Sequence, residues 1–574
     1  MPSALSLVRF GRPVSKTLQR LAVPLLVVLL AAAAYFYARD LAAAPAYPTP
    51  DEVLIALQAE SIYSTTHDRS GRLLPVYFEM TTYSWFQPMA IYAEAAVRLM
   101  APFDIRTFRL TTVGIALING LLAWLALRAM VGPWSALAGS LVLLTAPAHF
   151  IHGRLAMDYL YPVPFLLGWL WCLMEFERTL NHRWLAASGA LLAAGFFTYA
   201  SAIALMPAFF ALTLVRLALT TGLTTARPFV VAAAAICLWP AIWLSAHMEM
   251  LRDTITRYSP TSSTTGFLDK LGVYAEYYYP GFLALDAAGP ALFSLRGWGL
   301  VLPGSAIMFA IGVFALWRKD RSRFAFLLAG FIVAGLPVMI IDERHATQRI
   351  LPLLPFIAVC AAAGFDFLWR WVPSPAPTAL TALGALTLAV GLAYAAIILG
   401  LQGRVPGLGP PLIVAGSTAL VAGILPNAAP LGRVIAALLV VSIMSHFSAF
   451  VTLYRNDYPV TSRSLNGDLP GALRTLAREA ASANAPAIYL DAYIDMIDEY
   501  WQFTTLSSGG RVPGAKTNYR PQDFDAARVP AGSLILVRRD PTHAVSTAAL
   551  HGADRIIEIP ERSGLAIYTI YRKR

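Results

Sequence analysis

The sequence is poor in charge. Only 13% of its 574 residues are Asp, Glu, Lys or Arg, whereas 57% are hydrophobic and the mean hydropathy is +0.59. Soluble domains carry about 25% charged residues, so the composition argues against a soluble protein and indicates a membrane protein with several spans. The hydrophobic runs are continuous and rich in Leu and Ala, unlike the short alternating strands of membrane barrels, so we expect helical spans.

Cysteine and basic clusters are scarce as well. The three cysteines, Cys172, Cys237 and Cys360, all lie inside hydrophobic runs, which argues against disulfides and against a cysteine-based metal site. The formal net charge is +11, but most arginines are spread over short segments between hydrophobic runs. We therefore expect no nucleic-acid partner and interpret these arginines by the rule that positive residues face the cytoplasm.

The hydrophobic runs predict a mainly α-helical membrane protein of about thirteen spans. The first run, Leu21–Ala38, follows several basic residues and is interpreted as an uncleaved helix with a cytoplasmic N-terminus. A cleaved signal peptide is the alternative, for which Ala42–Ala46 offers only a weak cleavage site. The later spans are expected near 107–129, 134–151, 159–177, 184–200, 202–220, 228–247, 299–317, 324–341, 349–371, 379–401, 412–426 and 431–453.

Thirteen spans place alternate connections on opposite sides of the inner (plasma) membrane. The basic cluster Arg318–Arg323 then lies in the cytoplasm, as the charge rule requires. The external side receives four segments, 39–106, 152–158, 248–298 and 342–348.

The C-terminal part has a different character, so we divide the chain into a membrane module, residues 1–453, and an external domain, residues 454–574. In the latter, helices are expected at Asp468–Ala483 and Tyr493–Phe503, and strands at Ala487–Leu490, Ser533–Val537, Arg555–Ile559 and Ala566–Tyr571. These elements predict a small soluble α/β domain.

The polar segment after the first span contains two adjacent acids, Asp51 and Glu52. Thr49 suits the N-cap of a helix, Pro50 suits its first position, and Glu52 at the third would complete a capping box. Successive helical residues point about 100° apart, so only one acid can face a given site. We favour Asp51 as the catalytic residue and keep Glu52 as the alternative.

Other features of this segment are less specific. The spacing of Val53, Leu54, Leu57 and Ile62 indicates a helix lying along the membrane interface with these residues in lipid. Glu79 is a further acid in the segment and a second candidate for the site.

Two external turns carry the remaining candidates. Arg154 and Asp158 lie four residues apart, so they could pair on one face of a helix, either as a structural ion pair or facing a cavity. The polar turn at 342–349 contains Arg344, His345 and Arg349. Arg349 precedes a span, where a guanidinium could bind a lipid-linked phosphate or simply reach lipid headgroups.

Three stretches occur in an order typical of a known family: PDE at 50–52, GRLAMD at 153–158 and RHATQRILPLLP at 344–355. Together with the span layout they resemble the GT-C superfamily of polyprenyl-phosphate-sugar-dependent glycosyltransferases. The nearest branch contains the protein O-mannosyltransferases and the bacterial lipid A aminoarabinose transferases. The resemblance covers most of residues 20–370.

The resemblance implies a mechanism. A polyprenyl-phosphate sugar enters from the bilayer, and a group on a lipid, polysaccharide or protein acceptor attacks the anomeric carbon with inversion. It implies Asp51 as general base or acceptor-orienting acid. Arg349, with His345 and Arg154, would stabilise the polyprenyl phosphate leaving group. No cofactor follows, but a divalent metal stays open, since metal-binding relatives carry an acid followed by Lys-Pro, whereas this chain has Glu79-Met80.

A transporter or lipid flippase is the main alternative, and an envelope assembly scaffold is a third. A transporter predicts charged or broken segments near mid-span. The hydrophobic runs contain few such residues, and Asp366 lies near the cytoplasmic end of its span. A site on one side of the membrane is therefore more consistent with a transferase.

Overall fold

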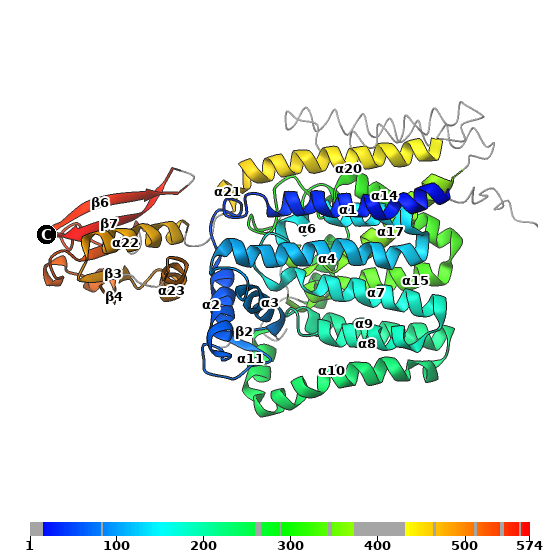
Figure 1. The fold of residues 1–574 in the computed structure, drawn as a ribbon, viewed down its shortest axis with the longest axis horizontal. Coiled ribbons are helices and arrows are strands. Elements are labelled where there is room, and N and C mark those ends of the chain that lie inside the picture. The colour runs from blue at the N-terminus through cyan, green and yellow to red at the C-terminus, as the bar shows by residue number, and fades with distance from the viewer. Residues whose placement is uncertain are drawn as a thin grey trace, which may run out of the picture.

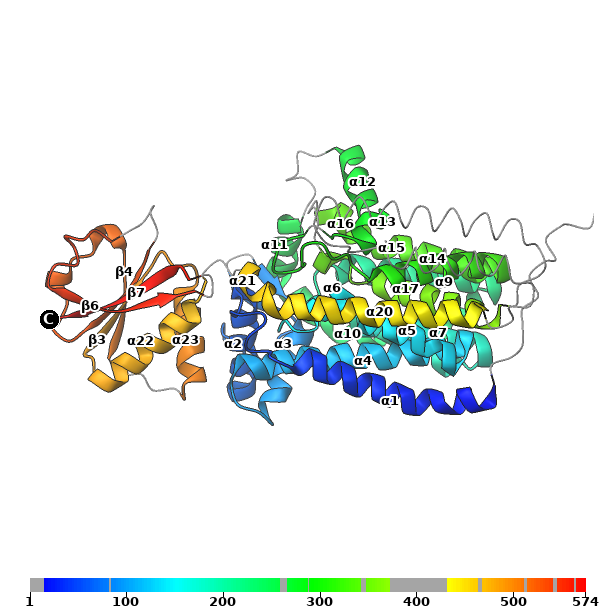
Figure 2. The ribbon, with the colours of Figure 1, turned by 90° about the horizontal axis from the view of Figure 1, so that it is seen from above.

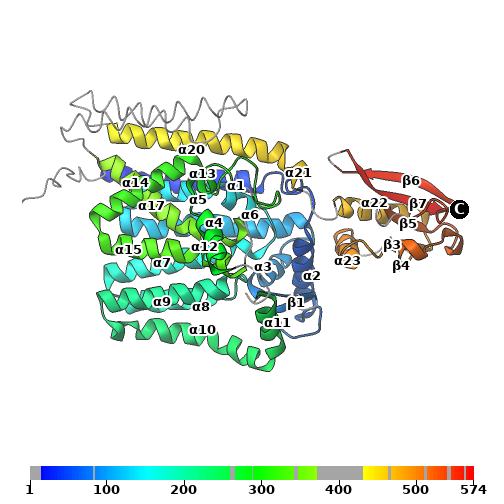
Figure 3. The ribbon, with the colours of Figure 1, turned by 180° about the vertical axis from the view of Figure 1, so that it is seen from behind.

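A computed structural model describes ten ranges of the chain: 15–81, 84–258, 266–287, 289–341, 347–371, 431–462, 467–509, 514–539, 545–561 and 564–574. A bundle of long helices forms one part, and a small sheet with its helices forms the other (Figure 1). Helix α2 (Pro50–Thr65) lies across the end of the bundle that faces the sheet (Figures 1 and 3).

Within these ranges, eight helical segments are long and apolar enough to cross a membrane, so a multi-span membrane protein is confirmed. They contain helices α1, α4, α7, α9, α10, α15, α17 and α20. The eight segments, in the same order, are Lys16–Ala38, Ile105–Val131, Asp158–Thr179, Ala202–Thr220, Leu223–Ala246, Arg321–Val338, Leu353–Arg370 and Gly432–Asn456. Four of the helices have bounds of their own within or next to these segments: α7 Pro162–Thr179, α10 Arg227–Ala246, α15 Arg321–Ala334 and α20 Leu431–Asn456.

The expected number of thirteen spans is not confirmed. The expected span at 134–151 is divided into α5 (Pro133–Leu144) and α6 (Pro147–His152), because proline disfavours helical backbone in the residue before it. Two further expected spans correspond to α8 (His182–Gly195) and α14 (Pro303–Lys319), which are shorter than the eight segments above. The expected spans at 379–401 and 412–426 lie outside the described residues.

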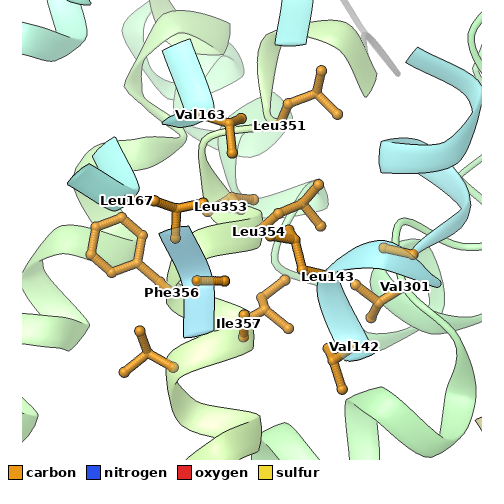
Figure 4. Close-up of a cluster of buried hydrophobic side chains, with 14 of the residues drawn as sticks. Val142, Leu143, Val163, Leu167, Val301, Leu351, Leu353, Leu354, Phe356 and Ile357 are labelled. Carbon is orange, nitrogen blue, oxygen red and sulfur yellow. The ribbon is translucent and has the colours of Figure 1, made fainter. Parts of the chain in front are cut away.

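Helix α17 (Leu353–Arg370) lies at the centre of the bundle, and nearly all of its residues are buried. Figure 4 shows its first turns packed against side chains of α5 and α7 (Pro162–Thr179). Its contact with α14 is close enough to require glycine, because a Cβ on Gly312 would lie 1.6 Å from the carbonyl oxygen of Cys360. The short helix η4 (Thr347–Arg349) is separated from α17 by three residues, so Arg349 lies close to the start of this buried helix.

Helix α2 is enclosed by protein, which corrects the expectation that its apolar side chains lie in lipid. Val53, Leu54 and Leu57 are at most 3% exposed, and Ile62 is 7% exposed. Helix α3 (Pro88–Arg98) packs against α2 on one side. Helix α23 (Ile497–Ser507) of the C-terminal part packs against it on another. The apolar side chains of α2 therefore lie in protein cores on both sides rather than in lipid.

The described part of segment 248–298 contains three short helices rather than plain loop. They are α11 (Met248–Tyr258), α12 (Phe267–Glu276) and α13 (Pro280–Ala284). In Figure 2, α11 lies at the same end of the bundle as α2, whereas α12 projects from the side of the bundle farther along its length.

The C-terminal part is a five-stranded sheet in the order β4-β3-β5-β7-β6, so the expected small α/β fold is confirmed. Strands β4, β3 and β5 are parallel, while β7 is antiparallel to both β5 and β6. Helices α22 (Leu469–Ala483) and α23 share one apolar core with the sheet. The strands are β3 (Ala487–Asp491), β4 (Ala515–Tyr519), β5 (Leu534–Arg538), β6 (Ala553–Pro560) and β7 (Ala566–Lys573).

One local expectation in this part was wrong, and one strand was missed. The helix expected at Tyr493–Phe503 begins at Ile497, because Met496 before it has a left-handed backbone with φ of 56°. Strand β4 was not predicted. It is an edge strand with four exposed residues, so its sequence shows neither an apolar run nor the alternation of a half-buried strand.

Candidate active site

The N-terminus of α2 forms as its sequence predicts. The Thr49 side chain accepts a hydrogen bond from the Glu52 amide at 3.2 Å, and the Thr49 amide donates to Glu52 Oε2 at 2.9 Å. Pro50 occupies the first helical position, where its missing N–H costs nothing. The capping box therefore fixes where α2 starts and turns Asp51 and Glu52 to different sides.

Glu52 faces the bundle interior and is fully buried. Its Oε1 accepts from Arg109 Nε at 2.8 Å and from the Ala156 amide at 2.9 Å, and its Oε2 accepts from Arg109 Nη2 at 3.0 Å. Arg109 is 1% exposed and donates its remaining N–H groups to the carbonyls of Leu41, Pro45 and Tyr47. This buried pair ties α2 to α4 and to the segment that leads into α2.

Asp51 faces a group of aromatic and charged side chains from distant segments. Tyr159 donates its hydroxyl to Asp51 Oδ2 at 3.3 Å. The Tyr159 ring packs edge-on against Tyr199 at 5.1 Å between centroids. Arg349 donates to the Tyr199 hydroxyl, and its guanidinium lies 5.3 Å from the centre of the Tyr199 ring. The two tyrosines thus connect the acid on α2 to the cation before α17.

Asp158 lies within the same group. It begins the short helix η1 (Asp158–Leu160), is 2% exposed, and lies within electrostatic range of both Asp51 and Arg349. Its Oδ2 has no hydrogen-bond partner in the described part of the chain. Two carboxylates and one guanidinium, predicted separately, are therefore brought together.

The expected pairing of Arg154 with Asp158 is wrong. Residues 153–157 form turns rather than a helix, so the four-residue spacing does not place the two side chains on one face. Arg154 is 1% exposed and donates to three main-chain carbonyls. Those of Phe36 and Tyr37 lie in the last turn of α1, and that of Ala44 lies in the segment after it. These bonds give Arg154 a structural role at the end of α1.

Glu79 lies in the hairpin of β1 (Phe78–Thr81) and β2 (Ser84–Phe86). Its carboxylate accepts from Arg72 at 3.1 Å, and the Arg72 guanidinium lies 4.9 Å from the Trp85 ring. Its partners thus belong to its own segment. Among the described residues, no group of three His, Cys, Asp or Glu is arranged to hold a metal ion. The candidates Arg344 and His345 lie outside the described residues.

Sequence reasoning missed Arg109, Tyr159 and Tyr199 as parts of this arrangement. Arg109 carried the clearest signal, because a charged residue five positions into a membrane span is expected to face a partner. The tyrosines carried no comparable signal, since tyrosine is common at membrane interfaces.

The arrangement is suited to one kind of chemistry. A half-buried carboxylate on α2 can accept a proton, and a guanidinium from the α17 side can stabilise negative charge that develops nearby. Between them, the Tyr159 hydroxyl donates to the acid and the Tyr199 hydroxyl accepts from the guanidinium. A displacement reaction with an anionic leaving group uses all of these features.

Comparisons with known proteins place the fold. No protein-family model and no curated protein sequence matches the chain. Among solved structures, the chain is similar to ArnT from Cupriavidus metallidurans bound to undecaprenyl phosphate. The TM-score is 0.57 at 15% identity, covering 96% of this chain and 97% of that chain. The apo state of ArnT gives a TM-score of 0.56 at the same identity and coverage.

The archaeal oligosaccharyltransferase AglB from Archaeoglobus fulgidus, in complex with an inhibitory peptide and a dolichol-phosphate, is a more distant neighbour. Its TM-score is 0.46 at 10% identity, covering 86% of this chain and 65% of that chain. The similarity to ArnT extends over nearly the whole length of both chains, membrane helices and C-terminal sheet included. The chain therefore shares the fold of ArnT over nearly its whole length, which agrees at the level of the fold with the resemblance indicated by its motifs.

Proposed function

We propose that this chain is an integral-membrane glycosyltransferase of the inner membrane. It transfers a sugar from a polyprenyl-phosphate donor to a hydroxyl or phosphate of an acceptor on the external face, with inversion at the anomeric carbon. The observation that carries the proposal is the meeting of Asp51 and Arg349 around Tyr159 and Tyr199. The ArnT structure with bound undecaprenyl phosphate supports a polyprenyl-phosphate lipid as the donor.

In this proposal Asp51 is the general base. A free carboxylate has a pKa of about 4, so it cannot deprotonate an alcohol in the ground state. It takes the proton as the acceptor oxygen bonds to the anomeric carbon and the bond from that carbon to the phosphate oxygen breaks. Asp158, close to both Asp51 and Arg349, orients the attacking group.

Arg349 stabilises the leaving group. The negative charge that develops on the polyprenyl phosphate is met by the Arg349 guanidinium, which lies just before α17 and is oriented by Tyr199. Preorganised charge of this kind is usually the largest contribution to such a reaction. His345 remains a proposed second donor to the phosphate. Arg154 already donates to three carbonyls, so we assign it the support of α1 instead.

The arrangement supports a transferase over a transporter. Asp51, Asp158 and Arg349 gather at one end of the bundle, near α2, whereas a transporter places its charged groups near mid-membrane. The distribution of arginines supports this end as the external one. The C-terminal sheet lies at the same end (Figure 1).

Sugar transfer by the purified protein tests the proposal. The full chain is incubated with labelled polyprenyl-phosphate sugars and lipid, polysaccharide or protein acceptors, and product is compared for the wild type and Asp51→Asn. We expect transfer by the wild type and a rate about 10²–10⁴-fold lower for the variant, the range typical of a lost general base. Transfer by the variant at the wild-type rate would remove Asp51 from the mechanism.

A further inference from the structure

The C-terminal part contacts the helix that carries Asp51. Helix α23 packs against α2, and Ile497, Tyr500 and Phe503 share one buried cluster with Val53 and Leu57. The cluster continues into the segment between α3 and α4, where the Phe503 and Phe103 rings lie 5.1 Å apart. The C-terminal domain thus covers a face of α2 that the membrane helices leave open.

A hydrogen bond ties α23 to the start of α2. Tyr500 is fully buried and donates its hydroxyl to the carbonyl oxygen of Pro48 at 3.1 Å. Pro48 immediately precedes Thr49, the N-cap of α2, and lies three residues before Asp51. A displacement of Tyr500 would therefore act on the part of the backbone that sets the direction of the Asp51 side chain.

Met496 makes a second contact with α2, and its backbone is strained. Its φ of 56° is a left-handed conformation that side chains other than glycine rarely adopt. The side chain packs against the cluster between α2 and α23 and also against the cluster between α2 and α3. At the rim, Arg69 donates to Gln502 at 3.1 Å.

Two different parts of the chain therefore hold the same helix end. From the membrane side, Arg109 binds Glu52. From the opposite side, Tyr500 binds the backbone just before Thr49. Capping alone fixes where a helix starts, whereas these long-range contacts fix where that start lies relative to Tyr159 and Arg349.

We propose that the C-terminal domain is a positioning element of the transferase: Tyr500, Met496 and Phe503 hold the N-terminus of α2 so that Asp51 faces the acceptor. The inference rests on the proposed role of Asp51. Tyr500 touches neither donor nor acceptor, so its loss lowers kcat and leaves the KM for the donor lipid unchanged, because donor binding depends on Arg349.

The test compares Tyr500→Phe with a matched control, Tyr519→Phe, in the full-length protein. Tyr519 is also buried and also donates its hydroxyl to a main-chain carbonyl, that of Leu536 at 2.8 Å, but entirely within the C-terminal domain. Each variant loses one hydroxyl and the hydrogen bond that this hydroxyl donates to a main-chain carbonyl. Sugar transfer and deuterium uptake by the peptide spanning residues 49–57 are measured for both.

We expect Tyr500→Phe to raise the rate of deuterium uptake in α2 about fivefold, the effect of one lost hydrogen bond. We expect kcat at least fivefold lower and the donor KM within twofold of the wild type. For Tyr519→Phe we expect wild-type kcat and wild-type uptake in α2. Phe503→Ala should act in the same direction as Tyr500→Phe, with unchanged uptake in β3 and β5 showing that the domain stays folded.

Failure of this inference can be told from failure of the proposed function. If the wild type transfers sugar and the two tyrosine variants have equal kcat, the C-terminal domain does not position Asp51. If the wild type transfers no sugar from any donor, the proposed function fails, and the deuterium uptake still decides whether Tyr500 holds α2. Equal uptake in both variants overturns the positioning role in either case.

Discussion

Replacing Glu52 by Gln tests the division of labour between the two adjacent acids. Glu52 accepts four hydrogen bonds, two at each oxygen, from Arg109, the Ala156 amide and the Thr49 amide. A glutamine has the same size, but its NH₂ group would face two donors in place of one oxygen. Arg109 would also lose its only carboxylate within the described part of the chain.

The magnitude follows from burial. Glu52 is 0% exposed and Arg109 is 1% exposed, so the unpaired guanidinium would stay out of water. Removing one partner of a buried pair costs about 3–5 kcal/mol of unfolding free energy. Two lost charge-assisted hydrogen bonds at about 1.5–3 kcal/mol each give a similar sum. Asp51→Asn, in contrast, changes a half-buried side chain and should cost at most about 1 kcal/mol.

Thermal denaturation of the detergent-purified protein, with a sugar-transfer assay, distinguishes the two acids. We expect Glu52→Gln to lower the Tm by several degrees. We expect Asp51→Asn to leave the Tm within about a degree of the wild type and to remove most of the activity. An unchanged Tm for Glu52→Gln would refute the structural role of the buried pair. A destabilised Asp51→Asn would refute the separation of structure from catalysis at the start of α2.

Two further predictions concern charges on either side of α2. Arg349→Ala should weaken binding of the donor lipid about 10- to 100-fold, the loss expected for one charge-assisted contact to phosphate. The control is Arg106→Ala, which removes an exposed arginine at the start of α4 and should leave donor affinity unchanged. Equal donor affinity for the two variants would remove Arg349 as the phosphate ligand. Burial, and then the nearby charge of Glu52, raise the pKa of Glu94 well above its usual range, so the folded protein retains a proton that the unfolded chain releases above about pH 4.3. Stability therefore falls as the pH rises, and the Tm of Glu94→Gln should exceed that of the wild type by more at pH 8 than at pH 5.5; a difference that does not change with pH would contradict this.

Local patterns in the sequence predicted the start of α2 closely. The residues of the capping box lie within four positions of one another, so the hydrogen bonds between Thr49 and Glu52 form wherever that helix forms. The break before Pro147 is also a local effect, because proline acts on the residue before it. The expected span at 134–151 did not take this proline into account. The Arg154–Asp158 pairing failed because it assumed a helix where the chain turns.

The partners of Asp51 depended on contacts that no local pattern encodes. Tyr159 is 108 residues from Asp51, and Arg349 is 150 residues from Tyr199. Likewise, the spacing of Val53 and Leu57 was correct for a helix, but what covers them follows from the docking of α23 from the far end of the chain.

The sequence by itself determined the class of the protein and its local structure. Hydrophobic length dictates spanning helices, because buried backbone must satisfy its own hydrogen bonds, and neighbouring side chains dictate where α2 begins. The tertiary structure decided which of two adjacent acids is buried with Arg109 and which faces Tyr159 and Arg349. That choice is made by packing between segments far apart in the chain, and their relative positions exist only in the folded protein.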